Sequence, residues 1–158
     1  MEIQYINPDY ALLALLYQAR FAVARVRNDA LRQFGITEVQ SAILNIVQAS
    51  DGPVIPSYIA RQMFRDRHVV SEALDRMEKR GLVTKVKDLE RKNLVRVSLT
   101  EKGEEICRRA MVVDVEAVSK TLSTLSQEER NNLKELLKAW RNKAIEEFHP
   151  KDRFPIYP

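Results

Sequence analysis

The sequence predicts a mainly α-helical protein with one small β-hairpin. Apolar residues recur at spacings of three and four over most of the chain, whereas alternation is confined to a short run within residues 82–99. The 158 residues include four Gly and six Pro, too few for a loop-rich or low-complexity chain. This length suggests one domain or two small interlocked ones.

The first predicted helix begins at Asn7-Pro8-Asp9, where Asn7 is the N-cap and the acid lies near the positive end of the helix dipole. It ends at Phe34-Gly35, because Gly35 can adopt a positive φ. Such a helix spans ~40 Å at 1.5 Å per residue, longer than a small globule needs. Its apolar stripe comprises Leu12, Leu16, Ala19, Val23, Val26 and Ala30.

Two shorter helices are predicted next. Thr37 and Gln40 form a capping box that opens the second helix, and the turn cluster at residues 50–53 follows its end. Val54-Ile55 is a candidate for a strand with a single ladder. The third helix covers Ser57 to about Phe64.

A fourth helix is predicted over Arg67–Arg80, with Asp66 as its N-cap and Gly81 as its stop. Val70, Leu74 and Met77 lie on one face and are expected to point into the core. Residues 82–87 and 94–99 then form a hairpin with a charged tip. The third and fourth helices are arranged as a helix-turn-helix, and the hairpin is placed as its wing.

The last two predicted helices carry a signal for assembly. Thr100 caps the fifth helix and Ser126 opens the sixth. Both are apolar over more than one stripe, so each needs more than one packing partner. A three-helix bundle within one chain is one solution, but the long first helix favours a dimer. The expected dimerisation residues are Leu12, Leu16, Leu136, Trp140, Phe148, Phe154, Ile156 and Tyr157.

Composition excludes several classes of function. Cys107 is the only cysteine, which excludes an internal disulfide and a cysteine-based zinc site, and two histidines are too few for a multi-histidine metal centre. There is no Gly-rich phosphate loop and no plausible Ser-His-Asp set, so we expect no enzyme and no cofactor. No signal peptide or transmembrane run is visible, which indicates a cytoplasmic protein.

The positive charge is concentrated in one part of the chain. Residues 61–96 contain eleven Lys and Arg against six Asp and Glu, whereas the remaining residues carry a net charge of −1. Such a patch is the electrostatic footprint of a polyanion partner, although a chance imbalance on a solvated helix face is the alternative.

In a helix-turn-helix the second helix enters the DNA major groove with its N-terminal residues toward the base edges. An arginine there can bond guanine O6 and N7, and a valine can touch a thymine methyl. The expected base contacts are Arg67, His68, Val69, Ser71 and Glu72. The expected contacts to the DNA backbone are Ser57, Arg61, Arg65, Arg76, Lys85 and Lys87. For Lys79 and Arg80 a structural role at the helix C-terminus is preferred.

These motifs resemble the winged helix-turn-helix core of the MarR family of bacterial transcription regulators. The resemblance rests on Tyr58-Ile59-Ala60, residues 66–71 and residues 74–83, together with the exit Leu99-Thr100-Glu101-Lys102-Gly103. It implies helical dimerisation regions at 1–34 and 101–158 around a DNA-binding domain at 35–100. It also implies a homodimer on a palindromic operator, a repressor role, and release by a small aromatic or anionic effector bound near Tyr17 and Arg20.

The wing departs from the family pattern. The family often places Asp-x-Arg-Asp at the hairpin tip, but here Asp88 is followed by Leu89 and Glu90. Arg91 is therefore the expected minor-groove residue, because a narrow minor groove attracts arginine. Lys92 and Asn93 are next in line for phosphates.

Two alternatives remain at this point. A winged helix can serve only for protein contacts or ligand sensing, without specific DNA binding.

Family members that sense peroxide generally use a cysteine near the N-terminus, which this sequence lacks, so Cys107 is expected to be a packed thiol rather than a redox sensor.

Overall fold

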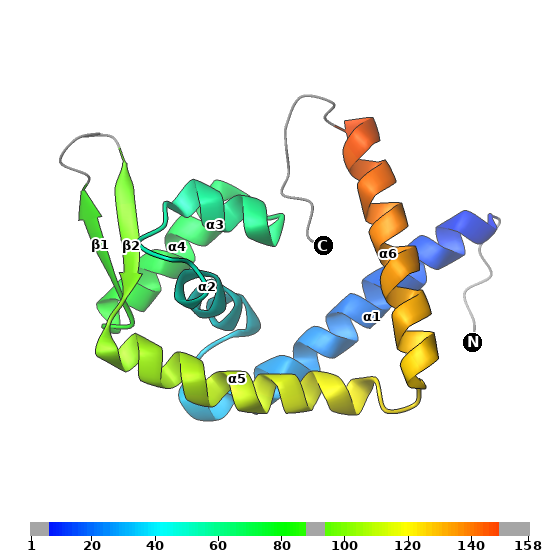
Figure 1. Cartoon of the computed structure of the whole chain (residues 1–158), viewed down its shortest axis with the longest axis horizontal. Coiled ribbons are helices and arrows are strands. Elements are labelled where there is room, and N and C mark those ends of the chain that lie inside the picture. Colours follow the sequence, from blue (N-terminus) through cyan, green and yellow to red (C-terminus); the bar gives the residue numbers. More distant parts are fainter. Residues whose placement is uncertain (1–6, 88–93, 149–158) are drawn as a thin grey trace.

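The computed structural model describes residues 7–87 and 94–148 and has the predicted order of elements (Figure 1). The helices are α1 (Pro8–Leu31), α2 (Glu38–Gln48), α3 (Pro56–Met63), α4 (Arg67–Lys79), α5 (Glu101–Thr121) and α6 (Gln127–Phe148). The strands are β1 (Val83–Lys87) and β2 (Val95–Leu99). The first helix ends earlier than predicted, because Arg32–Phe34 form a 3₁₀ turn before Gly35, which has φ 64°.

The helices begin at the caps that the sequence predicted. The capping side chains of Asn7, Thr37, Thr100 and Ser126 accept hydrogen bonds from the backbone N–H groups of Asp9, Gln40, Gly103 and Glu129. Asp66 occupies the N-cap position of α4 as predicted, but its side chain makes no capping hydrogen bond.

The two strands pair antiparallel, from Val83 opposite Leu99 to Lys87 opposite Val95. The single-ladder strand predicted at Val54 is confirmed, since its backbone exchanges two hydrogen bonds with Val97, of 3.1 and 2.7 Å. This bridge connects the segment before α3 to the hairpin. The hairpin is therefore held against the helix-turn-helix on the side of its strand β2.

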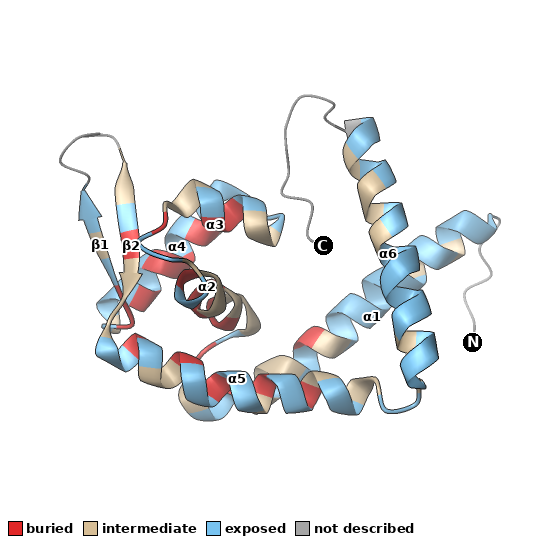
Figure 2. Ribbon diagram, in the orientation of Figure 1, coloured by how far each residue is buried: buried red, intermediate tan, exposed pale blue. Residues whose placement is uncertain are grey.

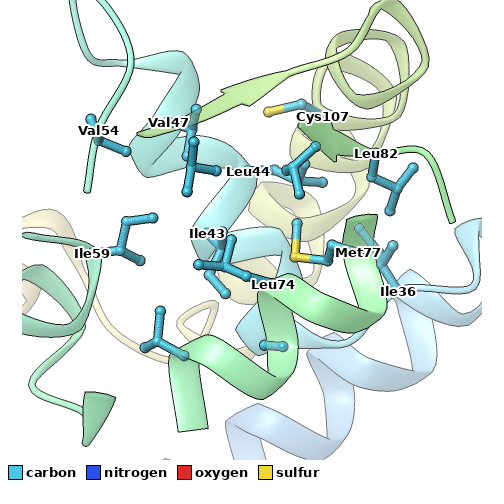
Figure 3. Packing of buried hydrophobic residues seen from close by; sticks show 14 of the residues in the cluster. Ile36, Ile43, Leu44, Val47, Val54, Ile59, Leu74, Met77, Leu82 and Cys107 are labelled. Atoms are coloured by element: carbon cyan, nitrogen blue, oxygen red, sulfur yellow. The ribbon is translucent and has the colours of Figure 1, made fainter. Parts of the chain in front are cut away.

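One hydrophobic core supports the helix-turn-helix. Ile43, Leu44, Ile59, Leu74 and Met77 are all fully buried and come from α2, α3 and α4. Figure 3 shows these side chains pointing toward one another between the helices. Burial in Figure 2 is concentrated in the same elements and along one face of α5. The predicted core face of the fourth helix is confirmed.

Close packing also fixes the entry into α5. A Cβ added at Gly103 would lie 2.0 Å from the carbonyl oxygen of Leu82, so only glycine fits. Thr100 contributes at the same junction, because its hydroxyl donates to the carbonyl of Gly81 at 2.6 Å. The hairpin and the long helix α5 are thus joined by close packing and a hydrogen bond.

The long helices α1, α5 and α6 extend away from this core (Figure 1). Only Ala24 and Leu31 of α1 are buried, both in its C-terminal half, which packs on α5. The N-terminal half of α1 and most of α6 are exposed (Figure 2). No helix in the described part of the chain is long and apolar enough to cross a membrane.

Candidate nucleic-acid interface

The turn between α3 and α4 is tight and unusual in its backbone. Phe64 ends α3 with φ 51° and ψ 44°, and it is the one non-glycine residue with positive φ in the described ranges. The N–H of Arg65 donates to the carbonyl of Ala60 at 3.0 Å and closes the turn. Helix α4 starts two residues later, at Arg67, and its first two side chains are exposed.

The side of α4 opposite the core is exposed. Val70, Ala73, Leu74 and Met77 are buried, whereas the predicted base-contacting residues Arg67, His68, Ser71 and Glu72 are exposed. Val69 lies on the flank of the helix and is half-buried in a groove that Ala73 and Arg76 also line. Four of the five candidates therefore share one accessible surface at the N-terminal end of the helix.

The candidates for contacts to the DNA backbone surround this surface. Arg61 and Arg65 are exposed beside the turn, Arg76 is exposed on the second half of α4, and Lys87 is exposed at the end of β1. Ser57, the second residue of α3, is half-buried. These four cations are therefore accessible to a partner.

Lys85 differs from the other cations because carboxylates already neutralise it. Its Nζ contacts an oxygen of Asp75 and lies 3.0 Å from Oε2 of Glu78, and its backbone N–H donates to Glu78. The hydrogen bonds to Asp75 and Glu78 raise the pKa of Lys85. This pairing joins α4 to β1. Sequence reasoning missed it, because the partners lie seven and ten residues away on a different element.

The structural role preferred for Arg80 is confirmed. Its guanidinium donates to the carbonyl oxygens of Gly35 and Phe34, which ties the end of α4 to the turn before α2. The carbonyl of Arg80 in turn accepts from Nζ of Lys102 at 2.8 Å. The wing residues Arg91, Lys92 and Asn93, by contrast, lie outside the described residues.

A second site lies between α1, α2 and the turn after α3. Its cavity of about 950 Å³ has an apolar wall that includes Tyr17, Phe21, Met63 and Phe64. The ring centroids of Tyr17 and Phe21 lie 4.7 Å apart, and the two rings are tilted relative to each other. Arg20 lines the same cavity. The sequence had implicated Tyr17 and Arg20, and the structure places both in one cleft.

A partly buried ionic network adjoins this cleft, and its members Arg20, Arg27 and Glu38 line the cavity. Arg27 donates two hydrogen bonds to Asp114, of 2.6 and 2.7 Å, and the hydroxyl of Ser41 donates to the same carboxylate at 2.8 Å. Burial by itself raises the pKa of Asp114, but the hydrogen bonds from Arg27 and Ser41 outweigh it and the pKa is lowered. Glu38 extends the network by accepting from Arg20 at 2.7 Å and from Arg27 at 3.2 Å. The network joins α1, α2 and α5.

Sequence reasoning missed this network, although one signal was available. Asp114 lies on the apolar stripe of α5, four residues after Ala110 and three before Ala117, both of which are buried. A carboxylate at a core position requires a cationic or hydrogen-bonding partner. That signal predicts a partner on another element without saying which one.

Exposed apolar side chains mark a third surface, on α1 and α6. Leu12 and Leu16 are exposed on α1, and Leu136 and Trp140 are exposed by 69% and 42% on α6. Leu16 and Trp140 line a groove of about 800 Å³ between the two helices. Of the other dimerisation candidates, Phe148 ends α6 with a side chain outside the description, and Phe154, Ile156 and Tyr157 lie outside the described residues.

Cys107 is packed as expected. It is buried in the core, and its thiol donates to Oδ1 of Asn45 at 3.3 Å. Burial raises the pKa of the thiol, which keeps it protonated at neutral pH.

Comparison with known proteins relates this arrangement to solved structures. The organohalide-sensing transcriptional regulator RdhR with bound 2,4-dichlorophenol aligns with a TM-score of 0.84 at 25% identity, over 96% of this chain and 94% of that chain. A MarR mutant from E. coli complexed with operator DNA aligns with a TM-score of 0.79 at 23% identity, over 87% and 98%. CouR from Rhodococcus jostii bound to p-coumaroyl-CoA aligns with a TM-score of 0.71 at 20% identity, over 79% and 87%.

The sequence comparisons match one part of the chain. No curated protein matches the sequence significantly. The MarR family profile matches residues 34–90, which cover α2, α3, α4, β1 and the turns between them. The matched segment contains the helix-turn-helix, and the long helices outside it have the same arrangement as in the solved regulators. The helix-turn-helix segment of this chain therefore matches the MarR family, and the whole chain is similar in fold to solved transcriptional regulators of that kind.

Proposed function

We propose that this protein is a sequence-specific DNA-binding transcription repressor that acts as a homodimer and is released by a small effector. The observation that carries the proposal is the exposed row of Arg67, His68, Ser71 and Glu72 on α4, whose opposite face is locked in the core. The net positive charge of residues 61–96 supports it, because phosphate neutralisation drives DNA binding.

Within this function the residues take different roles. Arg67 reads a guanine through O6 and N7, and Ser71 and Glu72 read neighbouring base edges. The exposed cations Arg61, Arg65, Arg76 and Lys87 bind phosphates, and Ser57 adds a hydroxyl at the start of α3. Lys85 contributes less than these, because its charge is already paired with Asp75 and Glu78. Arg91, Lys92 and Asn93 of the wing reach the minor groove and its phosphates.

A homodimer would cover the exposed apolar surface of α1 and α6. A row that includes Leu12, Leu16, Leu136 and Trp140 is larger than the scattered apolar residues of an ordinary monomer surface. A two-fold axis through these helices would present two copies of α4 to one face of the DNA. Successive major grooves on one face are one turn apart, so the half-sites form an inverted repeat with centres about 10 bp apart.

The cleft between α1 and α2 is the proposed effector site. Tyr17, Phe21 and Phe64 supply aromatic walls, and Arg20 supplies a cation. The structures of RdhR with 2,4-dichlorophenol and of CouR with p-coumaroyl-CoA support a small aromatic or anionic effector. The cleft adjoins the turn before α4, so an occupant can influence the DNA-reading helix.

Selection of bound DNA from a random pool tests this function. We expect an inverted repeat to be enriched, and affinity for it to fall about 10³- to 10⁵-fold between 50 and 200 mM salt if a dimer neutralises roughly 6–10 phosphates. Inserting five base pairs between the half-sites turns one of them to the opposite face and should abolish tight binding. Tight binding to the inserted operator, or to a single half-site, would contradict the symmetric dimer. No enrichment of any sequence would favour a protein-binding or ligand-sensing module.

A further inference from the structure

One of the arginines that line the effector cleft, Arg20, is already paired with a carboxylate of the protein itself. Arg20 lies beside the aromatic pair of Tyr17 and Phe21, but its Nη2 donates to Oε1 of Glu38 at 2.7 Å. Nη1 of Arg27 donates to the other oxygen of Glu38 at 3.2 Å. The side chain of Glu38 is 13% exposed and that of Arg20 is 44% exposed. An anionic occupant whose ring packs against Tyr17 and Phe21 therefore meets Glu38 at Arg20, the arginine between these two residues in α1.

We propose that the carboxylate of Glu38 is an internal competitor of the effector, which binds as an aromatic carboxylate by displacing Glu38 from Arg20. The proposal rests on the effector site proposed above and names how that site is regulated. The ring of the ligand packs against Tyr17 and Phe21, and its carboxylate accepts the hydrogen bond from Arg20 that Glu38 now accepts.

The two arginines differ in how easily Glu38 can be displaced from them. Arg27 is held by two hydrogen bonds from its guanidinium to the buried Asp114, so it stays in place. Arg20 is half-exposed and its side-chain hydrogen bond is to Glu38, so this guanidinium can turn to a ligand while Arg27 keeps its bonds to Asp114. The negative charge of Glu38 also opposes an incoming anion, which lowers the affinity of the cleft for it.

Displacement of Glu38 would affect α4, because Glu38 and residues of α4 line the same cavity. Glu38 is the first residue of α2, and its backbone N–H donates to Oδ1 of Asn28 at 2.7 Å. Glu38 lines both the effector cleft and a second cavity of about 720 Å³, whose other wall includes Val69 and Arg76 of α4. The bond between Glu38 and Arg20 thus joins α1 to the part of α2 that faces α4.

Titration calorimetry with benzoate tests the proposal in the full-length protein. We expect Glu38→Gln to bind benzoate about tenfold more tightly than the wild type, because it removes both the competitor and the like charge. Benzamide has the same ring without the charge, and its affinity should not change. Arg20→Ala in the Glu38→Gln background should remove the gain. Glu116→Gln is the matched control, since Glu116 is an exposed glutamate paired with Lys120 on α5.

Each outcome shows whether Glu38 competes with the ligand for Arg20 or has only a structural role. Equal benzoate affinity in the wild type and in Glu38→Gln would overturn the proposal, as would benzoate binding to neither. A parallel gain for benzamide would show that the variant only enlarges the cleft. DNA binding by the wild type is measured separately, so a failure of the DNA-binding function and a failure of the Glu38 competitor are distinguishable.

Discussion

At the scale of single residues, exposure and pairing separate side chains that look alike in the sequence. Arg67, Arg80 and Lys85 are all cations within the positively charged segment 61–96. Arg67 is exposed at the start of α4, Arg80 is bonded to backbone carbonyls, and Lys85 is bonded to carboxylates. Of the three, Arg67 is the one whose guanidinium makes no hydrogen bond or ion pair with the described residues, so this group is available to a partner.

Arg67→Ala should therefore weaken specific DNA binding by about 1–3 kcal/mol and relax the sequence preference at one base pair. The measurement is the affinity for the selected operator and for random DNA at one fixed salt concentration. Lys79→Ala is the control, because Lys79 is an exposed cation near the other end of the same helix. An equal loss on operator and random DNA would assign Arg67 to phosphates instead of bases.

Asp114→Asn should lower the free energy of unfolding by about 2–4 kcal/mol at neutral pH, because it leaves the partly buried Arg27 with Glu38 as its one remaining carboxylate partner among the described residues. The pKa of Asp114 is lowered in the folded state, so its contribution is present above the unfolded pKa of about 3.9 and is lost as the pH falls through the folded pKa. Urea unfolding between pH 3 and 7 should show the two proteins converging at the acid end.

Asp29→Asn is the control for that comparison. Asp29 pairs with Arg32 one helical turn away, and both side chains are mostly exposed. We expect a change within about 0.5 kcal/mol at every pH, because exposed pairs contribute little. A similar loss in both variants would show that the Arg27–Asp114 pair contributes no more to the free energy of unfolding than an exposed pair does.

At the scale of elements, the junction between the hairpin and α5 is held most closely. Gly103→Ala should destabilise the protein by about 1–3 kcal/mol, since the new methyl group would meet the backbone carbonyl of Leu82. Thermal unfolding measures this. Gly52→Ala is the matched control, because Gly52 has open space around it and does not have a positive φ. Equal melting temperatures for the two variants would mean that the junction can relax.

The elements themselves were largely predictable. Caps and apolar periodicity located α1, α2, α4, α5 and α6 to within a few residues, because these signals act within one or two helical turns. The 3₁₀ turn at Arg32–Phe34 and the positive φ of Phe64 were not predicted. Both occur where the chain changes direction between packed helices, so they depend on the neighbours more than on the local residues.

At the scale of the whole molecule, the exposed apolar surface of α1 and α6 makes assembly the central question. Deleting residues 149–158 should weaken the dimer, because Phe154, Ile156 and Tyr157 give this tail a strongly apolar end. Sedimentation of the truncated and full-length chains at sub-micromolar concentration measures the change. Unchanged sedimentation would remove the tail from the dimer contact and leave α1 and α6 as its proposed source.

The sequence by itself determined the order of elements, the core face of α4, the placement of charge and the resemblance to the MarR family. These features are encoded by residues close together in the chain, where helix periodicity and caps operate. Only the tertiary structure decided which charged groups meet. Arg27 and Asp114 lie 87 positions apart, and Arg20 and Glu38 lie 18 apart, on helices whose contact depends on the packing of the whole chain. Such pairings follow from three-dimensional packing, and no pattern within a short stretch of sequence contains them.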